Sequence, residues 1–273
     1  MTVAEPTTDY KGRYPFRLAC PSFIYPAGYV DNVRRLAGAV DEIELLLLES
    51  SPDSLPAIQE IRELAVIGND RGLTFNIHLP TDIDIGGLKP QAGSTAVDAL
   101  LRVIDLTGPL EPVSCTLHIP CPGIRDNTGG ISSWQDRVRK NLERLLNEGG
   151  ITARSIAIET LDYPLEYLDP VIRELDFSIC LDTGHLMVRD MDCLDVFRTW
   201  AERIIIVHTH GVEKGRDHLA LNRLTGYQTR QIAHILSTFR ESLSLEVFSP
   251  AALSASLDYL DRIWQDLSQF SNA

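Results

Sequence analysis

The sequence predicts an α/β fold consisting of a single closed (β/α)8 barrel. Its length of 273 residues is close to the roughly 250 that one such barrel needs. Short apolar runs alternate with longer segments of helical periodicity from end to end. No linker rich in Pro, Gly or Ser divides the chain. We therefore expect one barrel domain over residues 16–268, with tails at 1–15 and 269–273.

Eight short apolar runs, rich in β-branched residues, are typical of buried parallel strands. In chain order they cover Phe16–Ile24, Ile43–Leu48, Leu73–His78, Ser114–Ile119, Ser155–Glu159, Phe177–Leu181, Ile204–His208 and Leu243–Phe248. Each run is short enough to be a strand rather than a helix, which predicts the eight strands of the barrel.

The segments that follow these runs have apolar residues at helical spacing, as Val33 and Leu36 show in the first of them. Helices are predicted over residues 30–40, 54–68, 94–106, 133–150, 164–175, 192–202, 229–239 and 250–267. Ser54 is expected to cap the second helix, and the NEGG stretch at 147–150 is expected to end the fourth.

An open doubly wound sheet is the alternative architecture. Such a sheet usually has a glycine-rich phosphate turn after its first strand, whereas this chain has CPSFIYPAG there. The chain also has no phosphate-binding P-loop and no nucleophile elbow. The pattern therefore favours the closed barrel.

Charge and cysteine usage restrict the class of partner and the compartment. Lys and Arg number 25 and Asp and Glu 38, so the formal charge is −13, which argues against a nucleic-acid partner. Five cysteines, an odd number without a C-x-x-C pair, indicate a reducing compartment. The polar N-terminus and the short apolar runs predict neither a signal peptide nor a membrane span. We expect a cytoplasmic protein.

Polar residues gather where the predicted strands end. Six of the seven histidines lie there or just beyond, and only His234 lies in a predicted helix. The residues are His78, His118, Glu159, Asp182, His185, His208, His210 and Glu246, with Asp217 and His218 in the loop after the seventh strand. Because the carboxyl ends of barrel strands share one rim, which carries the active site, these side chains should converge.

Imidazole and carboxylate groups together are typical ligands of Zn, Mn and Fe. No Lys or Arg lies at these strand ends to neutralise the acidic groups, so the pattern predicts divalent metal ions. Taken singly, His78 could be a core residue, Glu159 could pair with an arginine and Asp182 could cap a helix. Their joint occurrence on one rim favours the metal site.

Four further residues are weaker candidates for substrate contact or for support of the metal ligands. Ser22 and Glu49 end the first two strands and point towards the rim, although they could equally cap loops. Asp82 could be catalytic or a turn residue. His210 could support the ligands or only line the mouth of the barrel.

The strand-end residues resemble those of the xylose-isomerase-like barrel superfamily, which includes the family 2 apurinic (AP) endonucleases, sugar epimerases and sugar isomerases. The resemblance runs from about Phe16 to Leu260. It implies one metal on His78, His118 and Glu159, a second on Glu159, Asp182, His208 and Glu246, and a third on His185, Asp217 and His218. One to three ions, with zinc preferred over Mn or Fe, are therefore expected. The adjacent Asp217 and His218 depart from the endonuclease pattern, which has one residue between them, so His210 could replace one of them.

Three sequence segments, called phrases below, most resemble the cobamide-remodelling phosphodiesterases of this superfamily. They are FRLACPSFIYPAGYVDNVRRLAGAVDEIELLLLES, FNIHLPTDI and HTHGVEKGRDHLAL. This resemblance implies hydrolysis of the nucleotide-loop phosphodiester of a cobamide, a B12-type corrinoid, to cobinamide phosphate and a lower-ligand riboside. In such a hydrolase Glu159 would bridge two metals and Glu246 would orient or deprotonate water.

Three other functions stay open. A single-metal sugar isomerase or epimerase would use Glu159 and Glu246 as its acid and base, and would bind a sugar. An endonuclease acting at abasic DNA sites is disfavoured by the acidic charge. A non-enzymatic corrinoid- or sugar-binding protein would not need a complete ligand set. The sequence does not indicate the oligomeric state.

Overall fold

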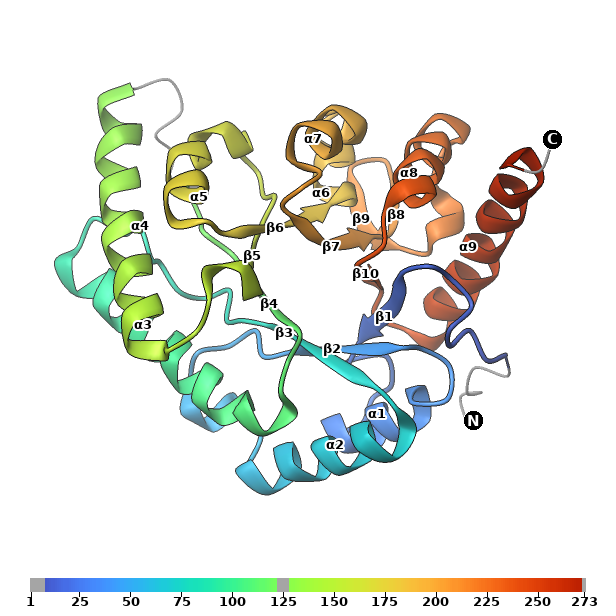
Figure 1. Ribbon diagram of the computed structural model, residues 1–273, viewed down its shortest axis with the longest axis horizontal. Helices are drawn as coiled ribbons and strands as arrows, with labels where there is room; N and C mark the ends of the chain where they lie inside the picture. The colour runs from blue at the N-terminus through green and yellow to red at the C-terminus, as the bar shows by residue number, and fades with distance from the viewer. Residues whose placement is uncertain (1–7, 122–127, 272–273) are drawn as a thin grey trace.

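The computed structural model describes residues 8–121 and 128–271, and it confirms the closed barrel. Eight parallel strands form it, each at a predicted position: β1 (Arg17–Pro21), β2 (Glu42–Leu46), β3 (Thr74–His78), β4 (Ser114–Leu117), β5 (Ile156–Glu159), β6 (Ser178–Asp182), β7 (Ile204–Thr209) and β10 (Ser242–Leu245). β1 pairs with both β2 and β10, which closes the sheet (Figure 1).

Helices surround the barrel as an outer layer (Figure 1). They are α1 (Tyr29–Leu36), α2 (Ile58–Arg71), α3 (Pro90–Thr107), α4 (Thr128–Gly149), α5 (Asp169–Leu175), α6 (Thr183–Val188), α7 (Cys193–Trp200), α8 (Gly226–Thr238) and α9 (Pro250–Ser271). Short 3-10 turns lie at η1 (Pro52–Ser54), η2 (Gly108–Leu110), η3 (Ala153–Ser155), η4 (Leu165–Tyr167) and η5 (Leu221–Arg223). None of the helices in the described parts of the chain is long and apolar enough to cross a membrane.

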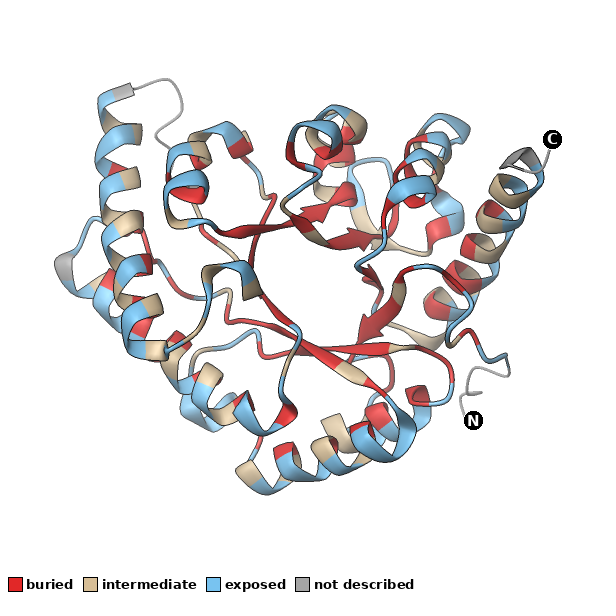
Figure 2. Ribbon diagram, viewed as in Figure 1, coloured by how far each residue is buried: buried red, intermediate tan, exposed pale blue. Residues whose placement is uncertain are grey.

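The main apolar core lies between the strands and the helices, and the buried faces of the helices turn towards the barrel (Figure 2). Inside the barrel the side chains are largely polar. Asn76 of β3 donates to Glu42 of β2, and Ser244 of β10 donates to Glu44 across the intervening β1. All four side chains are fully buried. The interior therefore carries a polar column that leads to the carboxyl rim.

The predicted cap at Ser54 is wrong. Ser54 ends the turn η1 and donates to Glu49, while α2 begins after Ala57, whose backbone N–H is bonded to Glu60. Pro56 explains the shift, because the residue before a proline is driven out of the helical region, and Leu55 is extended. The predicted end of α4 is confirmed at Gly149, and Gly150 follows with φ +59°.

Part of the expected N-terminal tail packs on the barrel. Tyr14 stacks on Phe16 and meets Trp264 of α9 edge to face, and the Tyr10 hydroxyl donates to Asp258. Two buried aromatic side chains anchor residues 8–15 in this way. Residues 1–7 and 272–273 of the expected tails lie outside the described residues. α9 continues to Ser271, past the predicted barrel boundary at residue 268.

Two elements on the carboxyl rim were not predicted. The short helix α6 starts directly at the end of β6, with Asp182 as its N-cap accepting from the His185 N–H at 2.8 Å. The loop expected after the seventh strand contains an antiparallel hairpin, β8 (Gly211–Glu213) and β9 (Arg216–Leu219), which contacts α6. Both elements carry predicted site residues.

Candidate metal centre

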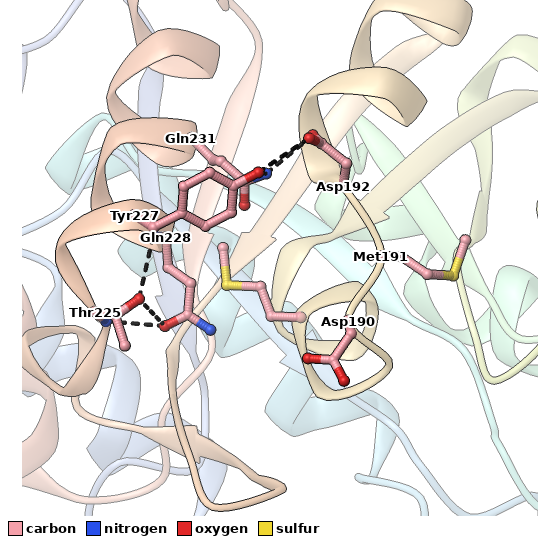
Figure 3. A pocket seen from close by; sticks show the side chains of 8 residues that line it. Asp190, Met191, Asp192, Thr225, Tyr227, Gln228 and Gln231 are labelled. Atoms are coloured by element: carbon pink, nitrogen blue, oxygen red, sulfur yellow. Dashed lines mark hydrogen bonds between the residues drawn. The ribbon is translucent and has the colours of Figure 1, made fainter.

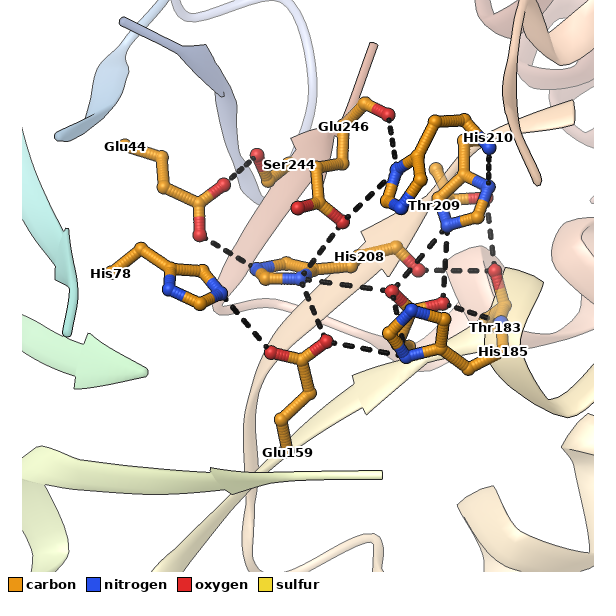
Figure 4. A network of polar contacts seen from close by, with 12 residues as sticks. Glu44, His78, Glu159, Thr183, His185, His208, Thr209, His210, Ser244 and Glu246 are labelled. Atoms are coloured by element: carbon orange, nitrogen blue, oxygen red, sulfur yellow. Dashed lines mark hydrogen bonds and ion pairs between the residues drawn. The ribbon is translucent and has the colours of Figure 1, made fainter. Parts of the chain in front are cut away.

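The structure brings all nine predicted metal ligands to the carboxyl rim. Their donor atoms form three groups, each with its atoms within 4.8 Å of one another. The groups are His78, His118 and Glu159; Glu159, Asp182, His208 and Glu246; and His185, Asp217 and His218. Glu159 belongs to two of them. Figure 4 shows five of them, His78, Glu159, His185, His208 and Glu246, pointing towards one another from different elements of the rim.

In the first group, two imidazoles approach one carboxylate oxygen. Nε2 of His118 lies 2.7 Å and Nε2 of His78 lies 3.3 Å from Oε2 of Glu159. Nδ1 of His78 donates to the Leu79 carbonyl at 3.1 Å, so Nε2 is the ring nitrogen that faces the group. A backbone bond of this kind orients a histidine for metal binding.

The second group surrounds His208. Its Nδ1 atom lies 3.4 Å from Glu246, 3.7 Å from Glu159 and 3.9 Å from Asp182. Nδ1 of His208 and Oε2 of Glu246 are buried without a hydrogen-bond partner among the described residues. Donor atoms placed tetrahedrally about 2.1 Å from an ion lie about 3.4 Å apart. The spacing and the unpaired atoms fit a shared divalent ion.

The third group depends on an unusual backbone conformation. Asp217 and His218 are neighbours on β9, and successive side chains of a regular strand point to opposite faces. His218 has φ +50°, in the left-handed region, so the alternation is interrupted. Both side chains consequently reach His185. The adjacent Asp–His pair therefore forms the third group without the intervening residue of the endonuclease pattern.

His210 contacts residues of the second and third groups, and with His218 and Glu246 it forms a further group of potential ligands. Its Nδ1 accepts from the His218 backbone N–H at 2.9 Å, and its Nε2 lies 3.2 Å from Oδ1 of Asp182. An Nδ1 atom that accepts a peptide N–H carries no proton, so the proton is on Nε2 and faces Asp182. Both ring nitrogens are engaged. His210 therefore links the hairpin to a carboxylate of the second group.

We predict that Gly184→Ala weakens metal binding. A Cβ at this position would lie 1.9 Å from the ring of His210, so the ring would have to move away from Asp182. Loss of a group that orients a ligand typically lowers metal affinity 10- to 100-fold, and about 10-fold is expected here. Titration with Zn²⁺ measures the effect. Gly38→Ala is the control, since its Cβ would have open space. Equal affinity in the two variants would contradict the role of His210.

Glu44 is a site residue that the sequence analysis missed. Its side chain is fully buried, its Oε1 lies 2.8 Å from Nε2 of His208, and its Oε2 accepts from Ser244 at 2.6 Å (Figure 4). This arrangement places a carboxylate behind the imidazole, so that Nδ1 faces the second group. Glu44 lies within the strand run EIELLLLES, and only a polar residue at alternate strand positions hinted at it.

The other three weaker candidates, Ser22, Glu49 and Asp82, belong to none of the groups of potential ligands. Ser22 is buried and accepts from the Leu46 N–H, which joins β1 to β2. Glu49 and Asp82 are exposed; Glu49 accepts from Ser54 and Asp82 accepts from Ser50. The first contact lies within one loop, and the second joins the loop after β2 to the loop after β3. His234 is exposed on α8, as expected for a helix surface residue.

Opposite charges shape the titration of the cluster. Burial acts to raise the pKa of Glu159, but the imidazoles of His118 and His208 hold it well below its usual range. The pKa of Asp182 is also lowered. Burial acts to raise it, but the nearby imidazoles of His210 and His185 outweigh that effect. For His78, burial acts to lower the pKa, but the Glu159 carboxylate raises it to about 9. Without metal, His78 therefore holds a proton at neutral pH that a metal ion would have to displace.

We predict that the metal-free protein loses stability as pH rises. The raised pKa of His78 contributes stability that is complete below 6.5 and lost as pH rises through about 9. A shift of this size corresponds to at most about 3 kcal/mol. Zn²⁺ affinity should rise over the same interval, because ligands must be unprotonated. Thermal unfolding of EDTA-treated protein between these pH values measures the effect. His78→Asn should reduce the change of melting temperature with pH, whereas His234→Asn should leave it as it is. A melting temperature of the unmodified protein that does not change between these pH values would contradict the prediction.

Two cavities lie near α6. One, of about 370 Å³, borders the metal groups at His118, His185 and Asp217. The other, of about 300 Å³, lies between the end of α6 and the start of α8 (Figure 3). In the second cavity Asp192 accepts from Tyr227 and Gln231, and Thr225 is bonded to Gln228, so these polar groups are paired with one another. Of the two, the first is the one that opens onto predicted site residues.

A closed (β/α)8 barrel with His and carboxylate groups clustered on its carboxyl rim defines the class of protein. The chain belongs to the family described as "Xylose isomerase-like TIM barrel", whose model matches residues 31–263. No curated protein matches the sequence. The five cysteines form no disulfide among the described residues, and all but the half-buried Cys121 are buried.

Solved structures confirm the fold. A D-tagatose 3-epimerase-like protein has a TM-score of 0.76 at 15% identity, over 93% of this chain and 99% of its own. An L-ribulose 3-epimerase has a TM-score of 0.71 at 18% identity, over 94% and 97%. Endonuclease IV from Thermus thermophilus has a TM-score of 0.66 at 16% identity, over 92% and 99%. At these identities the likeness concerns the fold alone.

Proposed function

We propose that the protein is a metal-dependent phosphodiesterase that holds more than one divalent ion. The observation that carries this proposal is the sharing of Glu159 between two groups of potential ligands, with a third group beside them. Neighbouring metal ions can stabilise both the attacking and the leaving oxygen of a phosphoryl displacement. A reaction at a single carbon centre needs no such clamp.

The proposed ligand sets are the three groups on the rim. Divalent ions bound there would lower the pKa of water from 15.7 towards about 7 and offset the charge on phosphate oxygens. Glu159 would hold two ions at a fixed separation. Oε2 of Glu246 is buried and makes no hydrogen bond among the described residues, so it would orient the attacking water or accept its proton. His and carboxylate ligands suit zinc, and also Mn or Fe.

The proposed substrate is a cobamide, cut at the phosphodiester of its nucleotide loop to give cobinamide phosphate and a lower-ligand riboside. This choice rests on the sequence resemblance in the first strand, the third strand and the hairpin. In the structure, the first phrase contains Glu44, the second contains His78, and the third contains His208, His210, Asp217 and His218. The resembling segments thus supply much of the metal centre.

A single-metal sugar epimerase or isomerase is the second candidate. The names of several similar structures favour it, because they describe epimerases acting on sugars. Such an enzyme would need only Glu159, Asp182, His208 and Glu246, all of which are present. It would not require His78, His118 and His218 as further ligands.

Metal counting combined with a product assay separates the two candidates. The purified protein is analysed for metal per chain, then incubated with adenosylated cobalamin and pseudocobalamin under reducing conditions, with EDTA-treated protein as the control. Two or three ions per chain, and cobinamide phosphate with a free riboside by mass spectrometry, are the expected results. A single ion, no cobamide cleavage and conversion of a ketose in a substrate screen would overturn the proposal.

A further inference from the structure

The cavity beside the metal groups has two kinds of wall. His118, His185 and Asp217 form one side, so a molecule in the cavity would lie against members of the first and third groups. Pro120, Leu161 and Val188 make another part of the wall apolar. Its volume of about 370 Å³ is within the range of small-molecule sites. An intact cobamide is far larger, so only one part of such a substrate would enter.

Arg189 brings a fixed positive charge to this cavity. It follows the last residue of α6, and its backbone N–H closes the helix on Leu186 and Met187. Its Nε atom is buried without a hydrogen-bond partner, and the described residues form no ion pair with its guanidinium. A buried N–H donor left without an acceptor is costly, and a ligand that supplies the acceptor recovers that cost. Two carboxylate side chains, those of Asp162 and Asp217, also line the cavity.

The chemistry of the guanidinium indicates the ligand. Its planar fork of donors matches two oxygens of a phosphate or carboxylate at once. Elsewhere in the described structure many arginines are bound to carboxylates on the surface, as Arg144 is to Glu148 and Asp98. Arg189 instead stands next to an acidic rim in a protein of net charge −13, where an anion needs local positive charge to bind.

We propose that Arg189 forms an anion subsite beside the metal centre, which binds phosphate oxygens of the substrate while an apolar group attached to the phosphate packs on Leu161 and Val188. This inference rests on the proposed phosphodiesterase function and makes it more specific. The metal ions would act at the reacting phosphorus, and Arg189 would select an anionic substrate over a neutral sugar. A neutral ketose offers this guanidinium no charge to pair with.

The test compares Arg189→Met and Arg189→Lys with the unmodified protein at equal metal content. Bis(p-nitrophenyl) phosphate, a phosphodiester with apolar arms, is the kinetic probe, and inorganic phosphate is the binding probe, measured by calorimetry. Arg189→Met should raise KM and weaken phosphate binding by about 30-fold each, the loss expected for a charged hydrogen-bonding pair. kcat should change less than KM. Arg189→Lys should restore part of the affinity.

Arg198→Met, on the exposed surface of α7, is the matched control and should leave both values unchanged. Phosphate binding and KM that are the same in Arg189→Met and the unmodified protein would overturn the subsite, even if the protein hydrolyses phosphodiesters. Conversely, weaker phosphate binding in Arg189→Met, in a protein that cleaves no phosphodiester, would support the subsite and overturn the proposed function. The two proposals can therefore fail separately.

Discussion

Replacement of Glu159 by glutamine is expected to reduce turnover by more than about 100-fold, the loss that one charge-stabilising group commonly causes. Glu159 is buried, and its two oxygens face His78 and His118 on one side and His185 and His208 on the other. Glutamine keeps the shape but removes the charge that both groups share. Metal content should therefore fall by at least one ion per chain, measured by mass spectrometry after dialysis.

The control for this variant is Glu202→Gln, an exposed residue just before β7, at the opposite end of the barrel from the rim. It should keep full metal content and turnover. A Glu159→Gln protein with normal metal content and near-normal turnover would contradict the shared-ligand arrangement. A loss of metal together with an unchanged far-ultraviolet circular dichroism spectrum would place the effect at the site and not in the fold.

Replacement of Glu44 by glutamine is expected to lower metal affinity by about 10- to 100-fold, the range typical of groups that orient a metal-binding histidine. Burial acts to raise the pKa of Glu44, but the charge of His208 lowers it overall, so the carboxylate is ionised when it faces the ring. Glutamine can still bond to Ser244 but removes the negative charge behind His208. Competition with a chelator of known affinity measures the change, and excess metal should restore turnover.

Glu42 provides a matched control on the same strand. It is equally buried, but it lies two residues earlier and binds Arg17, Thr74 and Asn76 at the amino end of the barrel. Glu42→Gln should lower the melting temperature without changing metal affinity. If the two variants lose metal affinity equally, Glu44 acts through general stability of the barrel interior and not through His208.

Periodicity, chain length and the lack of a glycine-rich turn after the first strand were enough to predict the barrel. Buried parallel strands are short continuous apolar runs, and all eight lie where such runs predict them. The site ligands followed from one topological fact, that parallel strands of a barrel end on the same rim. His78, Glu159 and Asp182 each end a strand, so the sequence placed them together without knowledge of any distance.

Only the tertiary structure decided how these residues are organised. Glu44 lies in an apolar run and meets His208 because side chains of β2 and β7, which are separated by β1 and β10, meet inside the closed barrel, a contact that no local pattern encodes. The left-handed turn at His218, which lets Asp217 and His218 face the same way, depends on the hairpin docking against α6 and His210. Likewise, only the packing of α6 at the rim places Arg189 in the cavity wall with its Nε atom buried and without a hydrogen-bond partner. The sequence by itself thus determined the fold and most of the candidate ligands, because strand periodicity is local. The grouping of these residues, the contacts that orient them and the cavity beside them arise from residues far apart in the chain.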